Sequence, residues 1–255
     1  SGEDPWKSEI PQTFTTLYVK TAGDNTVMTA EQMKAVADAV KALAAPATVD
    51  FSEVVYESET FPNSFKSNAN LAGIVFPQNV TKTASAAFQK TGMTSVTLLK
   101  GISYGSNAFD SCASLVSVTV EEGVTEIGNY MFQNTKLTDV TLPNSVTKIG
   151  ASAFNGCSLT TINFGQGVKT IENSAFQNCG ELTEIILPDA TETLGQNAFG
   201  DCPKLAKISL GKNMKTLEAY CFVGYSKGCP LLGDIICRAT TPPTLKDDYG
   251  TGPFG

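Results

Sequence analysis

Ser145 and Lys148 stand three residues apart, the spacing at which a lysine can activate a serine nucleophile. This spacing carries weight because the chain has no histidine, which removes Ser-His and Cys-His nucleophiles and every metal site that uses imidazole. However, the two residues belong to a turn and a return strand that recur along the chain. The sequence therefore predicts that the protein is not an enzyme and uses no cofactor.

Pairs of carboxylates are the next candidates for chemistry, because two carboxylates can together hydrolyse a glycosidic bond. Each pair lies in an expected turn or loop, where solvated surface charge is the favoured interpretation. The stretch 247–252 also lacks the ligand spacing of a calcium loop. The pairs are Glu57/Glu59, Glu121/Glu122 and Asp247/Asp248.

Five of the seven cysteines occupy one repeated position, three residues after a recurring phenylalanine, when an insertion at 225–228 is allowed for. Structural zinc prefers cysteine pairs roughly two to four residues apart, and these gaps are far longer, so we expect no metal site. The regular position favours free thiols buried in a stacked column, and one local disulfide among Cys221, Cys229 and Cys237 is left open. The five are Cys112, Cys157, Cys179, Cys202 and Cys229.

The recurring phenylalanine marks an internal repeat of 21 to 23 residues. After each one come further apolar columns, the last two of which are two residues apart, the period of a strand with one buried face. Turn residues such as Pro143-Asn144 and Gly165-Gln166 follow. The column consists of Phe65, Phe88, Phe109, Phe132, Phe154, Phe176, Phe199 and Phe222.

A single unit of this length cannot bury its apolar columns, whereas stacked units form a continuous core. Identical columns then align coil over coil, with parallel strands about 4.8 Å apart. The sequence therefore predicts a mainly β repeat solenoid of about eight coils with a parallel sheet.

The unit at 137–157 follows the string L-x-x-I-x-L-P-x-x-V-x-x-I-x-x-x-A-F-x-x-C almost throughout. This string resembles the BspA-like leucine-rich repeats of anaerobic bacteria, and the resemblance covers roughly residues 48–245. It implies a leucine-rich-repeat right-handed superhelix in a protein that is secreted or attached to the cell surface. It also implies a general role in adhesion to host proteins or other bacteria, without identifying a ligand.

The composition limits the partners. The formal charge is −7, from 18 basic and 25 acidic residues, which argues against nucleic acid because such binding depends on clustered Lys and Arg. No apolar run approaches the roughly 20 residues that a transmembrane helix needs. The opening Ser1-Gly2-Glu3 is unlike a signal peptide, so we expect that any signal or lipid anchor has been removed.

Residues 1–48 are predicted to form an N-terminal cap with one helix at about 30–44. Met33, Val36 and Val40 lie on one helical stripe, and Thr29 with Gln32 matches a capping box. Residues 14–20 alternate as a strand would. An independent ligand-binding domain is the alternative, but so short a segment rarely folds alone.

The solenoid itself is predicted to span 49–245, with its first strand at Val49 and Phe51. Residues 246–255 show no polar terminal cap of the kind that repeat proteins need. They are expected to be an irregular tail or the start of a truncated coil.

The outward positions of the strands form the candidate binding face, because solenoids present such rows as extended binding surfaces. We expect a monomer that recognises a protein or glycoprotein on a host or bacterial surface. The alternative is a structural spacer in a larger envelope protein, with no ligand of its own. The candidate residues are Thr97, Thr119, Asp139, Thr141, Thr161, Asn163, Glu184, Lys207 and Ser209.

Overall fold

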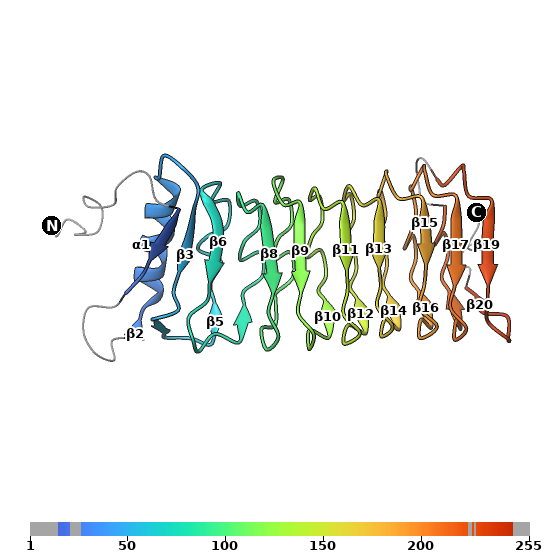
Figure 1. The fold of residues 1–255 in the computed structure, drawn as a ribbon, viewed down its shortest axis with the longest axis horizontal. Helices are drawn as coiled ribbons and strands as arrows, with labels where there is room; N and C mark the ends of the chain where they lie inside the picture. Colours follow the sequence, from blue (N-terminus) through green and yellow to red (C-terminus); the bar gives the residue numbers. More distant parts are fainter. Residues whose placement is uncertain (1–14, 21–26, 224–225, 227, 247–255) are drawn as a thin grey trace.

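The chain winds into a stack of coils that makes an elongated rod, with the N-terminal coils at one end and the C-terminal coils at the other (Figure 1). The structure is a computed structural model and describes residues 15–20, 27–223, 226 and 228–246. Every strand pairing is parallel, as expected when each coil returns to the same side in the same direction. The predicted mainly β solenoid is therefore confirmed.

The strands lie on two sides of the rod, which we call the first and second strand rows (Figure 1). The first row contains β1 (Thr16–Tyr18), β3 (Ala47–Asp50), β6 (Leu71–Val75), β8 (Ser95–Leu98), β9 (Ser117–Val120), β11 (Asp139–Thr141), β13 (Thr161–Asn163), β15 (Glu184–Ile186), β17 (Lys207–Leu210) and β19 (Asp234–Cys237). The second row contains β2 (Val27–Met28), β4 (Val55–Tyr56), β5 (Thr60–Phe61), β7 (Lys82–Thr83), β10 (Glu126–Ile127), β12 (Lys148–Ile149), β14 (Thr170–Ile171), β16 (Thr193–Leu194), β18 (Thr216–Leu217) and β20 (Thr244–Leu245).

The second strand row is the more continuous of the two, because its strands from β10 to β20 form one six-stranded sheet. Its apolar residues align in register, so that Ile149 pairs with Ile171, and Leu194 with Leu217. All four side chains are buried. These short strands thus fix one wall of the core.

The repeated phenylalanines close the third side of each coil. Their side chains are fully or almost fully buried, and successive rings from Phe88 to Phe199 stack, with centroids 5.6 Å apart between Phe109 and Phe132. The backbone of this side is also paired from coil to coil, since the Phe132 N–H donates to the Ala153 carbonyl at 2.8 Å. The predicted phenylalanine column is therefore a structural spine of the solenoid.

The N-terminal segment contains the helix α1 (Ala30–Lys41), close to its predicted position. The predicted capping box is present, because the Thr29 side chain accepts from the Gln32 N–H and the Gln32 side chain accepts from the Thr29 N–H. The side chain of Asn68, in the following coil, donates to the Ala37 carbonyl at 2.9 Å. The helix thus lies on the side of its coil that the repeated phenylalanines close in later coils.

Strands are present both at Val49 and within residues 14–20, as predicted. Val49 lies in a strand of the first row, and Leu17 in β1 pairs with it from the preceding coil. Phe51 follows the end of β3 and is buried in the core. The alternating residues near Leu17 therefore extend the sheet into the N-terminal segment.

The last described coil leaves its apolar columns uncovered. Ile235 is 38% exposed, whereas Ile208 in the preceding coil is fully buried. Likewise Leu245 is 52% exposed and Leu217 only 2%. Residues 247–255, which carry most of the predicted tail and the Asp247/Asp248 pair, lie outside the described residues.

Candidate binding face

The outward side of the first strand row holds all nine residues of the candidate face. Strand alternation places them there, since Val140 points inward and is buried while its neighbours Asp139 and Thr141 are exposed. Seven of the nine are exposed, and Lys207 and Ser209 are half-buried. The structure therefore places these residues on one side of the rod.

The candidate face is divided into blocks. Ladder pairing joins β8 with β9, β11 with β13, and β15 with β17 and β19. Within the described residues, no ladder links β9 to β11 or β13 to β15. Thr119 and Thr141 therefore follow one another along the face without being ladder partners, whereas Thr97 pairs with Thr119 and Thr141 with Asn163.

Ion pairs neutralise part of the face. The Glu184 carboxylate lies 2.8 Å from the Lys207 amino group, and this hydrogen bond raises the pKa of Lys207. The pair belongs to a set in which carboxylates of one coil meet lysines exactly one repeat later. The other members are Glu181–Lys204, Asp189–Lys212 and Glu192–Lys215.

This set was not recognised in the sequence, although its signal is present there as four carboxylates followed 23 residues later by four lysines. Stacked coils bring equivalent positions together, so the spacing alone places opposite charges side by side. Glu184 and Lys207 are therefore engaged with one another as well as available to a partner.

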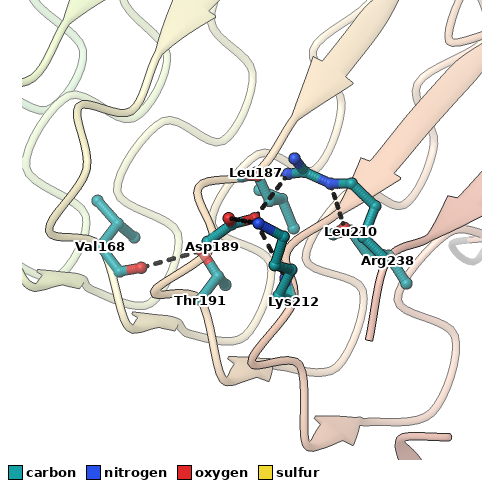
Figure 2. A network of polar contacts seen from close by, with 7 residues as sticks. All are labelled: Val168, Leu187, Asp189, Thr191, Leu210, Lys212 and Arg238. Atoms are coloured by element: carbon teal, nitrogen blue, oxygen red, sulfur yellow. Dashed lines mark hydrogen bonds and ion pairs between the residues drawn. The ribbon is translucent and has the colours of Figure 1, made fainter. Parts of the chain in front are cut away.

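Arg238 connects three coils at the edge of the candidate face, as Figure 2 shows. Its guanidinium donates to the Leu187 carbonyl at 2.9 Å and to the Leu210 carbonyl at 3.1 Å. It also lies 3.2 Å from the carboxylate of Asp189, which in turn pairs with Lys212 at 3.0 Å. The hydrogen bond from Lys212 lowers the pKa of Asp189, and the charges of Lys212 and Arg238 act in the same direction.

A hollow of about 390 Å³ lies beside this network. Its lining includes Asn163, which is the only candidate residue there, together with Pro188 and Arg238. Ile186 also lines the hollow, and its side chain is 59% exposed. In the ladder of β15, β17 and β19, Ile186 pairs with Ser209, and Ser209 pairs with Ile236, which is 45% exposed. The C-terminal part of the face thus changes from threonine to exposed isoleucine beside a hollow.

The five cysteines of the predicted column lie on the phenylalanine side, where each thiol donates to a phenylalanine carbonyl of the preceding coil. The thiol of Cys157 donates to the Phe132 carbonyl at 3.1 Å, and that of Cys179 to the Phe154 carbonyl at 3.3 Å. Burial raises the pKa of the Cys157 thiol to about 11 and that of Cys179 well above its ordinary range. These thiols are therefore core residues, remote from the candidate face.

The rest of the described chain shows little that resembles a reactive site. It contains no group of three or more Cys, Asp or Glu side chains placed to hold a metal ion. A second hollow of about 270 Å³ has Tyr104 and Glu126 among its lining residues. The Tyr104 hydroxyl accepts a hydrogen bond from the Leu99 N–H, which fixes the ring within the coil. Ser145 bonds to the Val124 carbonyl and so belongs to the turn, as predicted.

No helix in the described part of the chain has both the length and the apolar character to span a bilayer. A search among curated proteins found no match to this chain.

Solved structures with the same fold include a leucine rich cell surface protein from Faecalibacterium prausnitzii A2-165. It is 20% identical over 77% of this chain and 65% of that chain, with a TM-score of 0.52. This chain therefore spans less than two thirds of that relative's length. A leucine-rich repeat protein from Eubacterium ventriosum is 21% identical over 81% of this chain and 69% of that chain, with a TM-score of 0.49.

The sequence profile of the BspA type leucine rich repeat region matches six copies of the repeat, over residues 49–104 and 102–228. Because these ranges make up more than half of the sequence, the chain belongs to the BspA type leucine-rich-repeat family.

Proposed function

We propose that this protein is a secreted or cell-surface binding module that recognises a protein or glycoprotein partner through the candidate face. The observation that carries the proposal is the regular outward exposure of the first strand row, in which Thr97, Thr119, Thr141 and Asn163 follow one another along the rod. Membership of the BspA type family supports a surface location and an adhesive role.

The chemistry of the face suits a polar partner over most of its length. Hydroxyl groups of threonine both donate and accept hydrogen bonds, and the asparagine amide does the same, so the row can match hydroxyls or peptide groups. The exposed isoleucines Ile186 and Ile236 add an apolar contact at the C-terminal end. The face therefore offers both polar and apolar contacts, as protein-binding surfaces do.

The experiment is a binding assay of the purified chain on immobilised mucin, on extracellular matrix proteins and on intact bacterial cells. We expect saturable binding to at least one of these surfaces. The double variant Thr119→Arg/Thr141→Arg places bulky charges on the face and is expected to weaken that binding at least tenfold.

The matched control is Thr125→Arg/Thr147→Arg, which changes two exposed threonines by the second strand row. This control should bind as the unchanged chain does. If both double variants bind as tightly as the unchanged chain, the proposed face is contradicted. If both lose binding to the same extent, binding is not specific to this face.

The second candidate function is a structural spacer without a ligand. The uncovered apolar columns of the last described coil favour it, because such columns are the surface on which a further coil would stack. A spacer would give no saturable binding to any of the three surfaces.

A further inference from the structure

The insertion before Cys229 brings this cysteine into the thiol column, directly after Cys202. The Cys202 thiol donates to the Phe176 carbonyl at 3.3 Å, and the Cys229 thiol donates to the Phe199 carbonyl at 3.2 Å. The two cysteines therefore hold the same position in successive coils, although 27 residues separate them.

The backbone on both sides of Cys229 is held against the preceding coil. The buried carboxylate of Asp201 accepts hydrogen bonds from the N–H groups of Ser226 and Gly228, both at 2.9 Å. After the cysteine, the Gly233 N–H donates to the Ala206 carbonyl at 3.1 Å. Since Gly233 follows Cys229, and Ala206 follows Cys202, by the same four residues, the two coils are in register here.

This register suits a covalent bond between the two sulfur atoms. Neighbouring parallel segments lie about 4.8 Å apart, and a disulfide joins residues whose Cα atoms are roughly 4.4 to 6.8 Å apart. Cys202 and Cys229 hold equivalent positions in adjacent coils, so little movement of the backbone is required.

The two thiols differ in access. Cys202 is fully buried, like the other members of the column, whereas Cys229 is only half-buried. The neighbouring Cys202 thiol lowers the pKa of Cys229, and the neighbouring Cys229 thiol raises that of Cys202. Because the thiolate is the attacking species, Cys229 is the member that an external reagent meets first.

We propose that Cys202 and Cys229 form a redox-active pair that closes to a disulfide by exchange with a low-molecular-weight disulfide such as glutathione disulfide. In the first step the Cys229 thiolate attacks one sulfur atom of the small disulfide and releases one small thiolate, which takes up the proton lost by Cys229. Cys202 then loses its proton and attacks the sulfur of Cys229, and the second small thiolate leaves with that proton. Two protein thiols and one small disulfide thus give one protein disulfide and two small thiols.

The pair assigns a redox response to the last two coils. In a reducing compartment both thiols stay in the column, whereas in an oxidising environment the bond ties Cys229 to the coil before it. This differs from the local disulfide left open in the sequence, which joined two of Cys221, Cys229 and Cys237. Cys221 is buried and Cys237 lies in β19.

The experiment uses the full chain after reduction and removal of the reductant. The protein is incubated with glutathione disulfide, its remaining thiols are alkylated, and the digested peptides are mapped by mass spectrometry. We expect a peptide in which Cys202 is linked to Cys229, formed with the loss of two hydrogen atoms. We also expect the thermal midpoint to rise on oxidation and to return when dithiothreitol is added.

Three variants test the assignment. Cys229→Ser changes the half-buried member and should leave Cys202 unmodified in the folded protein. Cys179→Ser changes the preceding buried member of the column and Cys237→Ser changes an exposed cysteine, and both should leave the linked peptide intact. Circular dichroism of each variant verifies that the fold is retained.

Three outcomes would overturn the proposal. One is a mixed disulfide at Cys229 that persists without forming the internal bond. Another is a preferred link from Cys229 to Cys221 or Cys237. The third is an equal distribution of links in folded protein and in urea-unfolded protein, since the native contact would then have no part in the selection.

Discussion

The rings of Phe154 and Phe176 lie almost parallel, with their centroids 5.2 Å apart and an angle of 8° between their planes. They occupy the same position in successive coils, and both are fully buried. Each ring therefore packs against the coil before it and the coil after it. The loss of one ring should weaken two interfaces between coils as well as the coil that carries it.

Phe154→Ala should lower the free energy of unfolding by about 3 to 5 kcal/mol, the usual cost of removing a buried phenylalanine. Chemical denaturation followed by circular dichroism measures the change. Val116→Ala, at an exposed position of the same solenoid, is the control and should have little effect. A loss at Phe154 no larger than that at Val116 would contradict the role of the ring column as a spine.

Stability should fall as the pH rises above about 9. Burial raises the pKa of Cys157 from its ordinary 9.0 to about 11 and that of Tyr104 from 10.0 to about 12. The folded state therefore holds these protons more tightly than the unfolded state does, so their contribution is complete below the unfolded pKa. It is lost progressively as the pH approaches the folded value.

The measurement is the free energy of unfolding at a series of pH values from about 8 to about 11, under reducing conditions. Cys157→Ala removes one of the titrating groups and should make the slope shallower, whatever its effect on absolute stability. A free energy that stays constant over this range would show that the buried thiols and the tyrosine do not titrate as described.

The ion pairs between coils should respond to charge reversal and to salt. Glu184→Lys places a second positive charge beside that of Lys207 and should slightly lower the thermal midpoint at low ionic strength. Because both side chains are partly exposed to solvent, added salt should reduce the difference. The exchange Glu184→Lys/Lys207→Glu restores opposite charges and should recover the midpoint. Failure of the double variant to recover would show that the two side chains do not interact.

Arg238→Met should destabilise the end of the solenoid. The substitution keeps an unbranched side chain but leaves the Leu187 and Leu210 carbonyls without their guanidinium donor, at a cost of about 1 to 3 kcal/mol. Hydrogen exchange should show the extra opening in β17 and β19 but not in β9. Uniform exchange throughout the chain would contradict a local role for Arg238.

Much of the architecture could be predicted because the same residue types recur at regular spacings along the sequence. The two-residue alternation around Val140 and the capping box at Thr29 each depend on neighbours within one coil or helix. The phenylalanine spacing repeats from one coil to the next. The family inferred from these columns is confirmed by the matching profile. The strand near Leu17 was predicted but its pairing with β3 was not, because this segment lies outside the repeat.

The sequence predicted which residues of the candidate face point outward, but not how the strands that carry them pair with one another. Alternation determines that Thr141 and Asn163 point away from the core. It does not reveal that the pairing is interrupted between β9 and β11 and between β13 and β15, since ladder bonds depend on the exact path of each turn. The use of the face by a partner stays a proposal.

The sequence by itself determined the repeat, its buried columns and the cysteine positions, because each follows from which residues recur at the coil period. Only the tertiary structure decided which side chains meet across coils of unequal length. Arg238 reaches a carbonyl 51 residues earlier, and Cys229 takes the position in the thiol column that follows Cys202. The reason is physical: stacking sets the distance between coils, while insertions and turns set which atoms arrive at that distance.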